Sequence, residues 1–319
     1  MQTTLRVRRY NPENPQPAAY FESYDLELDP SDSVLDGLIK IRETLDDSLT
    51  LRCSCRGAIC GSCGMRINGH ASLACKTNVV SVSPSGETIE VEPMNNMPVI
   101  KDLVTDMAPF WEKIRQIQPW LKPSKPPPVA EYTAPPETMS HLAGVMSCIM
   151  CGVCVSDCTV LEVDKRFVGP AALAKAYRFV ADPRDTATST RLETLNQASG
   201  MWDCTRCMEC IQVCPKDVGP MDRIMALRSK AMAEKMPATC GSRHAEVFTD
   251  IIKHKGILDE PMLAIRTFGL KHVGRLLDMI PMVFQSVFKG KVPLSGPLHR
   301  PISSIQHIQR LFKRVRTKS

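Results

Sequence analysis

The sequence predicts an α+β protein with a small N-terminal sheet domain, a mainly helical second domain and a basic helical tail. Residues 4–10 and 20–28 partly alternate apolar with polar side chains, as strands do. Residues 137–240 read as helices between runs of cysteine, and twelve of the 14 cysteines fall into three groups. We place the boundaries at 1–110 for the sheet domain, 111–136 for a helix and proline-rich linker, 137–240 for the helical domain and 241–319 for the tail.

The sheet domain shows the element order of a β-grasp ferredoxin. Its first two strands are separated by the turn-forming stretch NPENPQP. Residues 33–45 then place apolar side chains on one helical face, with Asp32 or Ser33 as the N-cap. After the first cysteine loop, Asn68-Gly69 is a strong hairpin signal, and TIEVE alternates as a last strand.

Two segments connect the domains and shape the second one. Residues 98–120 have helical periodicity, so we expect a helix that leads into the second domain. Residues 122–136 contain six prolines, which predicts an extended, semi-rigid linker. Gly169-Pro170 and Gly219-Pro220 each precede a helical pattern, and proline suits the first turn of a helix.

Composition and charge limit the classes of function. The N-terminus has no apolar signal segment and the chain has no run of 18 apolar residues, which predicts a cytoplasmic chain without a transmembrane helix. Residues 261–319 hold eleven Lys or Arg and one acid, a charge of +10 within a net charge of +6. The glycine patterns of nucleotide-binding loops are absent, so we expect no flavin, nucleotide or nucleic acid on this chain.

The first cysteine group has the C-x4-C-x2-C spacing and distant fourth cysteine of a plant-type [2Fe–2S] site. Its members are Cys55, Cys60, Cys63 and Cys75. We expect Gly57, Gly61 and Gly64 to let the backbone fold tightly enough to aim its amides at the sulfurs. Structural zinc is the alternative, and it is disfavoured because zinc ligands usually come as two C-x2-C pairs. Cys53 and Cys240 are interpreted as packed thiols.

The other two groups repeat the C-x2-C-x2-C-x3-C run of two-cluster ferredoxins, in which the fourth cysteine of each run binds the cluster of the other. One predicted [4Fe–4S] ligand set is Cys148, Cys151, Cys154 and Cys214. The other predicted set is Cys204, Cys207, Cys210 and Cys158. Disulfides are a poorer explanation in a chain of this size, and each run should tie the other in place.

Together these motifs resemble the iron–sulfur subunit of succinate dehydrogenases and fumarate reductases. The resemblance covers residues 1 to about 240 and is carried by CRGAICGSCGMRINGHASLACKT, PVIKDLVTDM, CIMCGVCVSDC, FVGPAALAKAYRFVADPRD and CIQVCPKDVGP. It implies the same ligand sets, with Cys158, Cys204 and Cys210 on the third cluster. It also implies an electron-transfer subunit between an FAD-containing dehydrogenase subunit, which performs the substrate chemistry, and a membrane-anchor subunit. The complex would sit at the inner face of the cell membrane.

This chain departs from the family pattern around the third cluster. Typical members have a non-cysteine residue at the position of Cys207 and hold [3Fe–4S], whereas the complete run here predicts [4Fe–4S]. Thr159 follows Cys158 where the family often has proline. The Trp and His that quinone-binding members place beside this cluster have no counterpart in VLEVDKR or at Thr205. A quinone near the third cluster therefore stays an open expectation, and a heterodisulfide-reductase-like, cysteine-rich partner is the alternative to a conventional anchor.

The tail is a third departure, since typical members end near residue 240. Apolar residues in 262–291 are interrupted by Arg266, Lys271, Arg275 and Pro281. Further on, an apolar face of Ile305, Ile308, Leu311, Phe312 and Val315 opposes Arg310, Lys313, Arg314 and Arg316. A basic amphipathic helix suits an anionic membrane surface or an acidic partner, and the alternative is a solvated helix packed on its own chain. A third hypothesis makes the chain a membrane-docking or assembly module with structural clusters.

Overall fold

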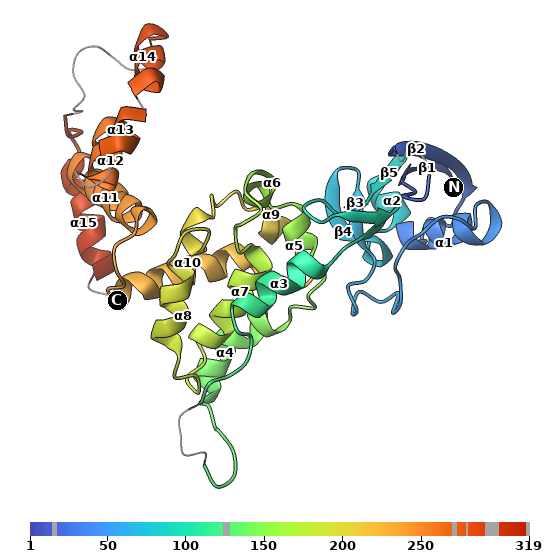
Figure 1. Cartoon of the computed structure of the whole chain (residues 1–319), viewed down its shortest axis with the longest axis horizontal. Helices are drawn as coiled ribbons and strands as arrows, with labels where there is room; N and C mark the ends of the chain where they lie inside the picture. The colour runs from blue at the N-terminus through green and yellow to red at the C-terminus, as the bar shows by residue number, and fades with distance from the viewer. Residues whose placement is uncertain (15–17, 124–127, 270–272, 279, 291–299, 317–319) are drawn as a thin grey trace. The chain divides into compact units, whose positions relative to one another are not determined.

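The computed structural model describes residues 1–14, 18–123, 128–269, 273–278, 280–290 and 300–316. The chain divides into two compact units, residues 1–234 and residues 235–319. The first unit contains both the sheet and the helical domain (Figure 1). The middle of the proline-rich linker, Lys271 and Lys291 lie outside the described residues.

The sheet has five strands in the order β2-β1-β5-β3-β4. The strands are β1 (Gln2–Arg9), β2 (Tyr20–Glu27), β3 (Gly64–Ile67), β4 (His70–Leu73) and β5 (Ile89–Glu92). β1 and β5 are parallel and the other neighbours are antiparallel, with β3 and β4 joined by the expected Asn68-Gly69 turn. The short helices η1 (Ala74–Lys76) and α2 (Val79–Val82) precede β5.

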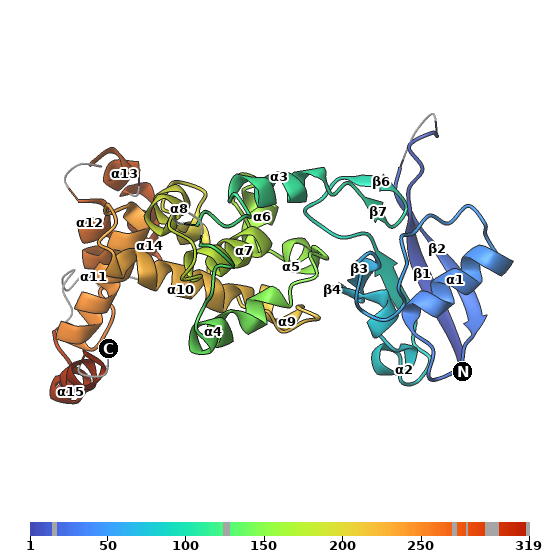
Figure 2. The same ribbon diagram turned by 90° about the horizontal axis from the view of Figure 1, so that it is seen from below.

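Helix α1 (Val34–Thr44) lies across one face of this sheet (Figure 2). Gly37 permits the close approach, since a Cβ at this position would lie 3.1 Å from Leu28 Cδ1 and 3.2 Å from Leu5 Cδ2. Ser33 is the N-cap and forms a capping box with Asp36, so one of the two predicted caps is confirmed. The apolar face of α1 and the inward side chains of β1 and β5 form the buried core of the sheet domain.

The prediction of one helix over residues 98–120 is wrong in its first half. The chain forms β6 (Val99–Lys101) and β7 (Val104–Thr105) before α3 (Ala108–Gln116). The turn between the two strands is fixed by Asp102, whose carboxylate accepts hydrogen bonds from Arg9 Nε at 3.1 Å, Tyr10 N at 3.0 Å and Thr50 N at 2.9 Å. These long-range contacts outweigh the local helical periodicity.

The helical domain is built around α7 and α10, which pack against each other. Its elements are α4 (Pro136–Met146), α5 (Val153–Ser156), α6 (Thr159–Val163), α7 (Pro170–Val180), α8 (Thr188–Leu195), η2 (Met201–Asp203), α9 (Glu209–Gln212) and α10 (Pro220–Ala233). Pro170 and Pro220 stand in the first turns of α7 and α10, as expected. The cysteine runs lie in the short segments around α5 and α9.

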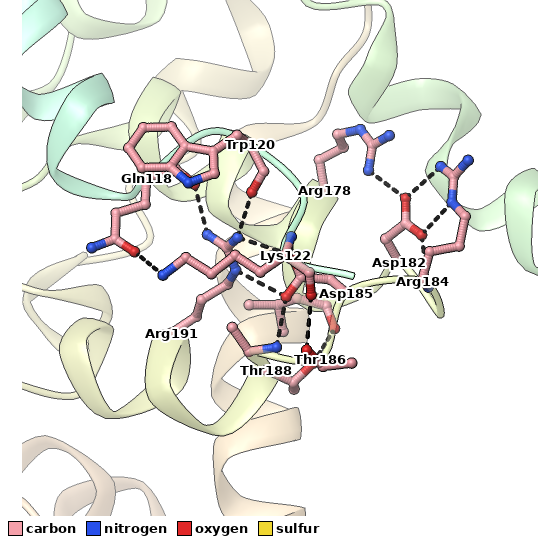
Figure 3. A network of polar contacts seen from close by, with 12 residues as sticks. Gln118, Trp120, Lys122, Arg178, Asp182, Arg184, Asp185, Thr186, Thr188 and Arg191 are labelled. Carbon is pink, nitrogen blue, oxygen red and sulfur yellow. Dashed lines mark hydrogen bonds and ion pairs between the residues drawn. The ribbon is translucent and has the colours of Figure 1, made fainter. Parts of the chain in front are cut away.

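A buried arginine ties the end of α3 and the start of the linker to α8 (Figure 3). Arg191 donates to both carboxylate oxygens of Asp185 and to the carbonyls of Ile117, Gln118 and Trp120. Asp185 also accepts a hydrogen bond from the backbone N–H of Lys122 at 3.0 Å. The linker therefore begins bound to the helical domain.

The second unit consists of α11 (Cys240–Lys255), α12 (Glu260–Phe268), α13 (Val273–Asp278), α14 (Ile280–Phe288) and α15 (Ile305–Arg316). The amphipathic helix expected near 305–315 is present as α15, and it packs against α11. Gly256 makes this possible, because a Cβ there would lie 2.6 Å from Ile302 and 3.0 Å from Ile308. Among the described helices, none is long and apolar enough to cross a bilayer.

Candidate iron–sulfur centres

The first cysteine group surrounds a loop whose backbone amides face sulfur atoms. Cys55 Sγ accepts from the N–H groups of Gly57 at 3.4 Å, Ile59 at 3.3 Å and Cys60 at 3.2 Å. Cys63 Sγ lies 3.3 Å from Cys75 Sγ. Amides aimed at sulfur favour the charged thiolate, which is the form that binds iron.

Most residues with left-handed backbone conformations in this loop are not the glycines that were expected to provide them. Of the three glycines that the sequence singled out, Gly61 alone has a positive φ, of +73°. Arg56 and Ala58 have φ values of +52° and +55°, which side chains other than glycine adopt rarely. Strain of this kind persists where the surrounding structure enforces it, and here it brings the N–H of Ala58 to 3.4 Å from Cys75 Sγ.

The thiols of this loop differ in their environments. Burial raises the pKa of Cys63 to about 12. A hydrogen bond with Ser62 lowers the pKa of the exposed Cys60 to about 6. The Cys60 thiol therefore loses its proton more readily than the Cys63 thiol, and a metal bound by both would have to displace the proton of Cys63.

The second group lines a cavity in the helical domain that opens to solvent. The cavity and its open mouth together enclose about 400 Å³. Its four cysteines are Cys148, Cys151, Cys154 and Cys214. Three of them come from the segment before and within α5, while Cys214 follows α9. The N–H of Val218 lies 3.4 Å from Cys214 Sγ. The structure thus brings together the cysteines that the sequence analysis grouped across the two runs.

The third group lines a separate cavity, with about 320 Å³ of empty space. Its four cysteines are Cys158, Cys204, Cys207 and Cys210. Cys158 is the N-cap residue of α6, whereas the others lie before and within α9. Positive φ angles at Arg206 and Met208 curl this segment around the cavity. Thr205 lines the same cavity.

The two cavities differ from a preformed site for a single ion. Among the described residues, no three His, Cys, Asp or Glu side chains are placed to hold one metal ion together, whereas four thiols surround each apolar cavity. Burial raises the pKa of Cys154 strongly, that of Cys151 to about 11 and that of Cys210 to about 12. A metal bound by these buried thiols would have to displace their protons.

The sheet domain touches the helical domain directly between the first two cysteine groups. A Cβ on Gly61 would lie 2.7 Å from Cys151 Cβ, so only glycine leaves room for this contact. A cavity beside it is lined by both Cys60 and Cys151. Gly61 and Cys151 therefore bring the first cysteine group into direct contact with the second.

Polar contacts that the sequence analysis missed hold this junction together. Arg66 of β3 forms a 2.8 Å ion pair with the buried Asp157, which also accepts from Ala71 N at 2.8 Å. Asn96 donates to the carbonyls of Val155, Ser156 and Cys158. Asp157 stands inside the cysteine run, but no spacing rule marks its partner ninety-one residues away.

A second missed residue lies against the third group. Arg228 of α10 is buried and donates to the carbonyls of Met201 and Cys204, the latter at 2.8 Å. Its guanidinium stacks 5.2 Å from the centre of the Trp202 ring. The arginine thus fixes the backbone at one of the cysteines of the third group.

A ferredoxin-like sheet domain and a helical domain, joined at a contact between their cysteine groups, define an iron–sulfur electron-transfer protein. Two family models match the chain: a 2Fe-2S iron-sulfur cluster binding domain over residues 4–112 and a 4Fe-4S dicluster domain over residues 144–218. The binding of [2Fe–2S] and [4Fe–4S] clusters follows from these matches.

Proteins of related sequence and structure indicate which iron–sulfur proteins the chain resembles. The chain is 41% identical over 229 residues to the fumarate reductase iron-sulfur subunit of Mycobacterium tuberculosis, covering 71% of this chain and 92% of the relative. It is 36% identical over 232 residues to the corresponding subunit of Haemophilus influenzae, covering 69% and 89%. A chain of the Mycobacterium smegmatis Sdh1 complex in the apo form matches with a TM-score of 0.68 and 27% identity, over 75% of this chain and 99% of that one.

The chain belongs to the family of succinate dehydrogenase and fumarate reductase iron–sulfur subunits. This confirms the resemblance, the α+β fold and the electron-transfer role in an oxidoreductase complex that the sequence analysis expected. Neither family model extends into the second unit, residues 235–319.

Proposed function

We propose that the chain carries single electrons between an FAD-containing dehydrogenase subunit and a membrane-side, quinone-reactive subunit of a succinate:quinone or quinol:fumarate oxidoreductase. The observation that carries this proposal is the grouping of twelve cysteines into three sites of four, two of which meet at Gly61 and Cys151. Iron–sulfur clusters supply one-electron transfer when bound at such sites. The substrate chemistry belongs to the flavin-bearing partner.

Each site has a proposed set of ligands. The [2Fe–2S] cluster is held by Cys55, Cys60, Cys63 and Cys75. The first [4Fe–4S] cluster is held by Cys148, Cys151, Cys154 and Cys214. The third cluster is held by Cys158, Cys204, Cys210 and Cys207. The rest of the chain positions these ligands: amides face the sulfurs of the first site, and Asp157 and Asn96 fasten the run 148–158 to the sheet domain.

Exposed side chains beside two of the sites support docking of two different partners. Cys55, Cys60 and Ile59 are exposed on the loop of the first site, which suits approach by the flavoprotein. Val163 and Met208 are exposed near the cysteines of the third site, which suits the membrane-side subunit. We propose that the complex is attached to the inner face of the cell membrane through that subunit.

Reduction by substrate tests the function. Succinate added to the purified complex should reduce the clusters, and the complex should couple succinate oxidation or fumarate reduction to a quinone pool. Clusters that stay oxidised with succinate, in a complex whose flavin is reduced, would refute the proposed path. A merely structural role for the clusters predicts that result.

The third cluster is proposed to be [4Fe–4S], because Cys207 lines the same cavity as the other three cysteines. Each iron of a cubane takes a ligand from outside the cluster, and a site with only three thiolates loses its fourth iron readily to give [3Fe–4S]. We expect the air-free oxidised wild type to lack a strong [3Fe–4S] EPR signal and Cys207→Ala to gain one. Cys53→Ala is the matched control, since Cys53 lines none of the three sites. A [3Fe–4S] signal in the wild type at full iron occupancy would show that Cys207 is not a ligand.

A cysteine-rich partner is the second candidate for the membrane-side subunit. It is favoured by Cys207 and by Thr205, which lines the third cavity where quinone-binding members have histidine. Mass spectrometry of the subunits that copurify with the chain distinguishes this partner from a haem-bearing anchor. A conventional anchor with bound haem would exclude it.

A further inference from the structure

The second unit exposes an apolar helix that the electron-transfer function does not use. α14 has the sequence IPMVFQSVF and contains no charged residue. Its largest side chains face solvent, with Phe284 61% and Phe288 85% exposed. In Figure 1 the helix follows α13 at the end of this unit, beyond α11 and α12. An exposed surface of this kind in a folded unit calls for an apolar environment.

Four of the exposed apolar residues of α14 form a stripe, and Met282, which is 56% exposed, lies outside it. Ile280, Val283, Phe284 and Phe288 have spacings of three, four and eight residues and are all exposed, so they share one helical face. Gln285, and Lys289 just beyond the end of the helix, lie on the opposite side. A helix of nine residues is about 14 Å long, less than half of the roughly 30 Å hydrocarbon core, so it can lie in a bilayer surface but cannot cross it.

The positive charge of the sequence around α14 indicates which kind of surface the helix would contact. From residue 279 to the last residue the sequence has eight Lys or Arg and no Asp or Glu. A protein groove of ordinary composition gains little from such uniform charge, whereas a leaflet with anionic headgroups attracts every one of these residues. Aromatic residues at the edge of an apolar stripe suit the boundary between headgroups and acyl chains.

The two helices α14 and α15 differ in the apolar surface that they leave exposed. The apolar face of α15 was the expected candidate for membrane docking, but Ile308 of that face lies beside Gly256 at the end of α11. The two apolar residues that α15 leaves most exposed are Leu311 and Val315, at 60% and 69%. The packed helix can supply cations to a surface, while α14 supplies the continuous apolar stripe.

We propose that α14 is an interfacial membrane helix that inserts its Ile280–Phe288 stripe into an anionic lipid leaflet, with the basic residues of the tail on the headgroups. The chain would then contact the bilayer itself, in addition to any contact through a partner subunit. This inference does not rest on the proposed electron path, because neither the cysteines nor their cavities take part in it.

The test uses the full cluster-loaded chain without partner subunits. It is floated with vesicles of phosphatidylcholine containing phosphatidylglycerol and with vesicles of phosphatidylcholine alone. We expect binding to the anionic vesicles only, weakened by high salt. The double variant Phe284→Ser with Phe288→Ser should bind on the order of tenfold or more weakly, because two large apolar side chains no longer enter the lipid.

A matched control replaces two exposed apolar residues of α15, Leu311→Ser with Val315→Ser, and should keep wild-type binding. Unchanged circular dichroism and cluster absorbance verify that both double variants are folded. The proposal is overturned if the wild type fails to float, if the α14 variant floats like the wild type, or if the α15 variant loses binding equally. In complexes assembled with the FAD-containing subunit, cluster reduction by succinate should be the same for all three proteins, so a failure of lipid binding is distinguishable from a failure of the electron path.

Discussion

Replacing Gly61 by alanine tests whether the contact between the first two sites depends on a missing side chain. The change has two costs. A positive φ costs an alanine about 1–2 kcal/mol. The new Cβ would lie 2.7 Å from Cys151 Cβ and 3.0 Å from its Cα, and overpacking of this kind costs about 1–3 kcal/mol. The expected destabilisation is therefore about 2–5 kcal/mol.

Gly69→Ala provides the control, because Gly69 has a similar φ of +81° and a Cβ added there would meet nothing within 4 Å. It carries the backbone cost alone, about 1–2 kcal/mol. Thermal unfolding of the cluster-loaded chain should thus show Gly61→Ala melting a further roughly 3–10 °C below Gly69→Ala. Visible absorbance per chain should also fall in Gly61→Ala, since Cys151 is displaced. Equal melting temperatures and equal absorbance in the two variants would refute the reasoning.

Two further predictions concern the network of Figure 3. Arg191→Ala leaves the buried Asp185 without its counter-charge and should lower the free energy of unfolding in guanidinium by about 3–5 kcal/mol. Arg184→Ala should lower it by only about 1 kcal/mol, because Arg178 still pairs with Asp182. Equal losses in the two variants would contradict this account. Hydrogen bonds from Arg184 hold the pKa of Asp182 below its ordinary 3.8, so its stabilisation is complete above about pH 5 and is lost as the pH falls below 4. The melting temperature of Asp182→Asn should be lower than that of the wild type at pH 7, and the difference should shrink towards pH 3; a constant difference would count against the assignment.

Much of the first domain could be predicted because its signals are local. The Asn68-Gly69 turn fixes one hairpin, and Ser33 caps a helix whose apolar face is visible in the sequence. The segment 98–107 could not be predicted in this way. Its two strands depend on hydrogen bonds from Arg9 and Thr50, two distant parts of the chain, to Asp102. The local pattern of apolar residues does not reveal these contacts.

The grouping of the cysteines could be predicted for a different reason. The exchange of the fourth cysteine between two runs is a rule about spacing, so it placed Cys214 and Cys158 with the correct neighbours in advance of any structure. The residues that hold the sites against each other follow no such rule. Asp157, Asn96 and Arg228 act through partners that only the folded chain brings near.

The exchange of cysteines between the two runs also limits the order in which the protein can be made. Sixty residues separate Cys154 from Cys214, and both line one cavity. During synthesis the first run leaves the ribosome long before Cys214, and its four thiols lack their proposed partners from the second run in the meantime. The proposed third site has all four cysteines once Cys210 of α9 has emerged, and the proposed second site once Cys214 has, so a chain truncated before α9 would complete neither set. We therefore expect the proposed sites of the helical domain to receive iron late, and the loop from Cys55 to Cys75 to be able to receive it once the sheet has formed.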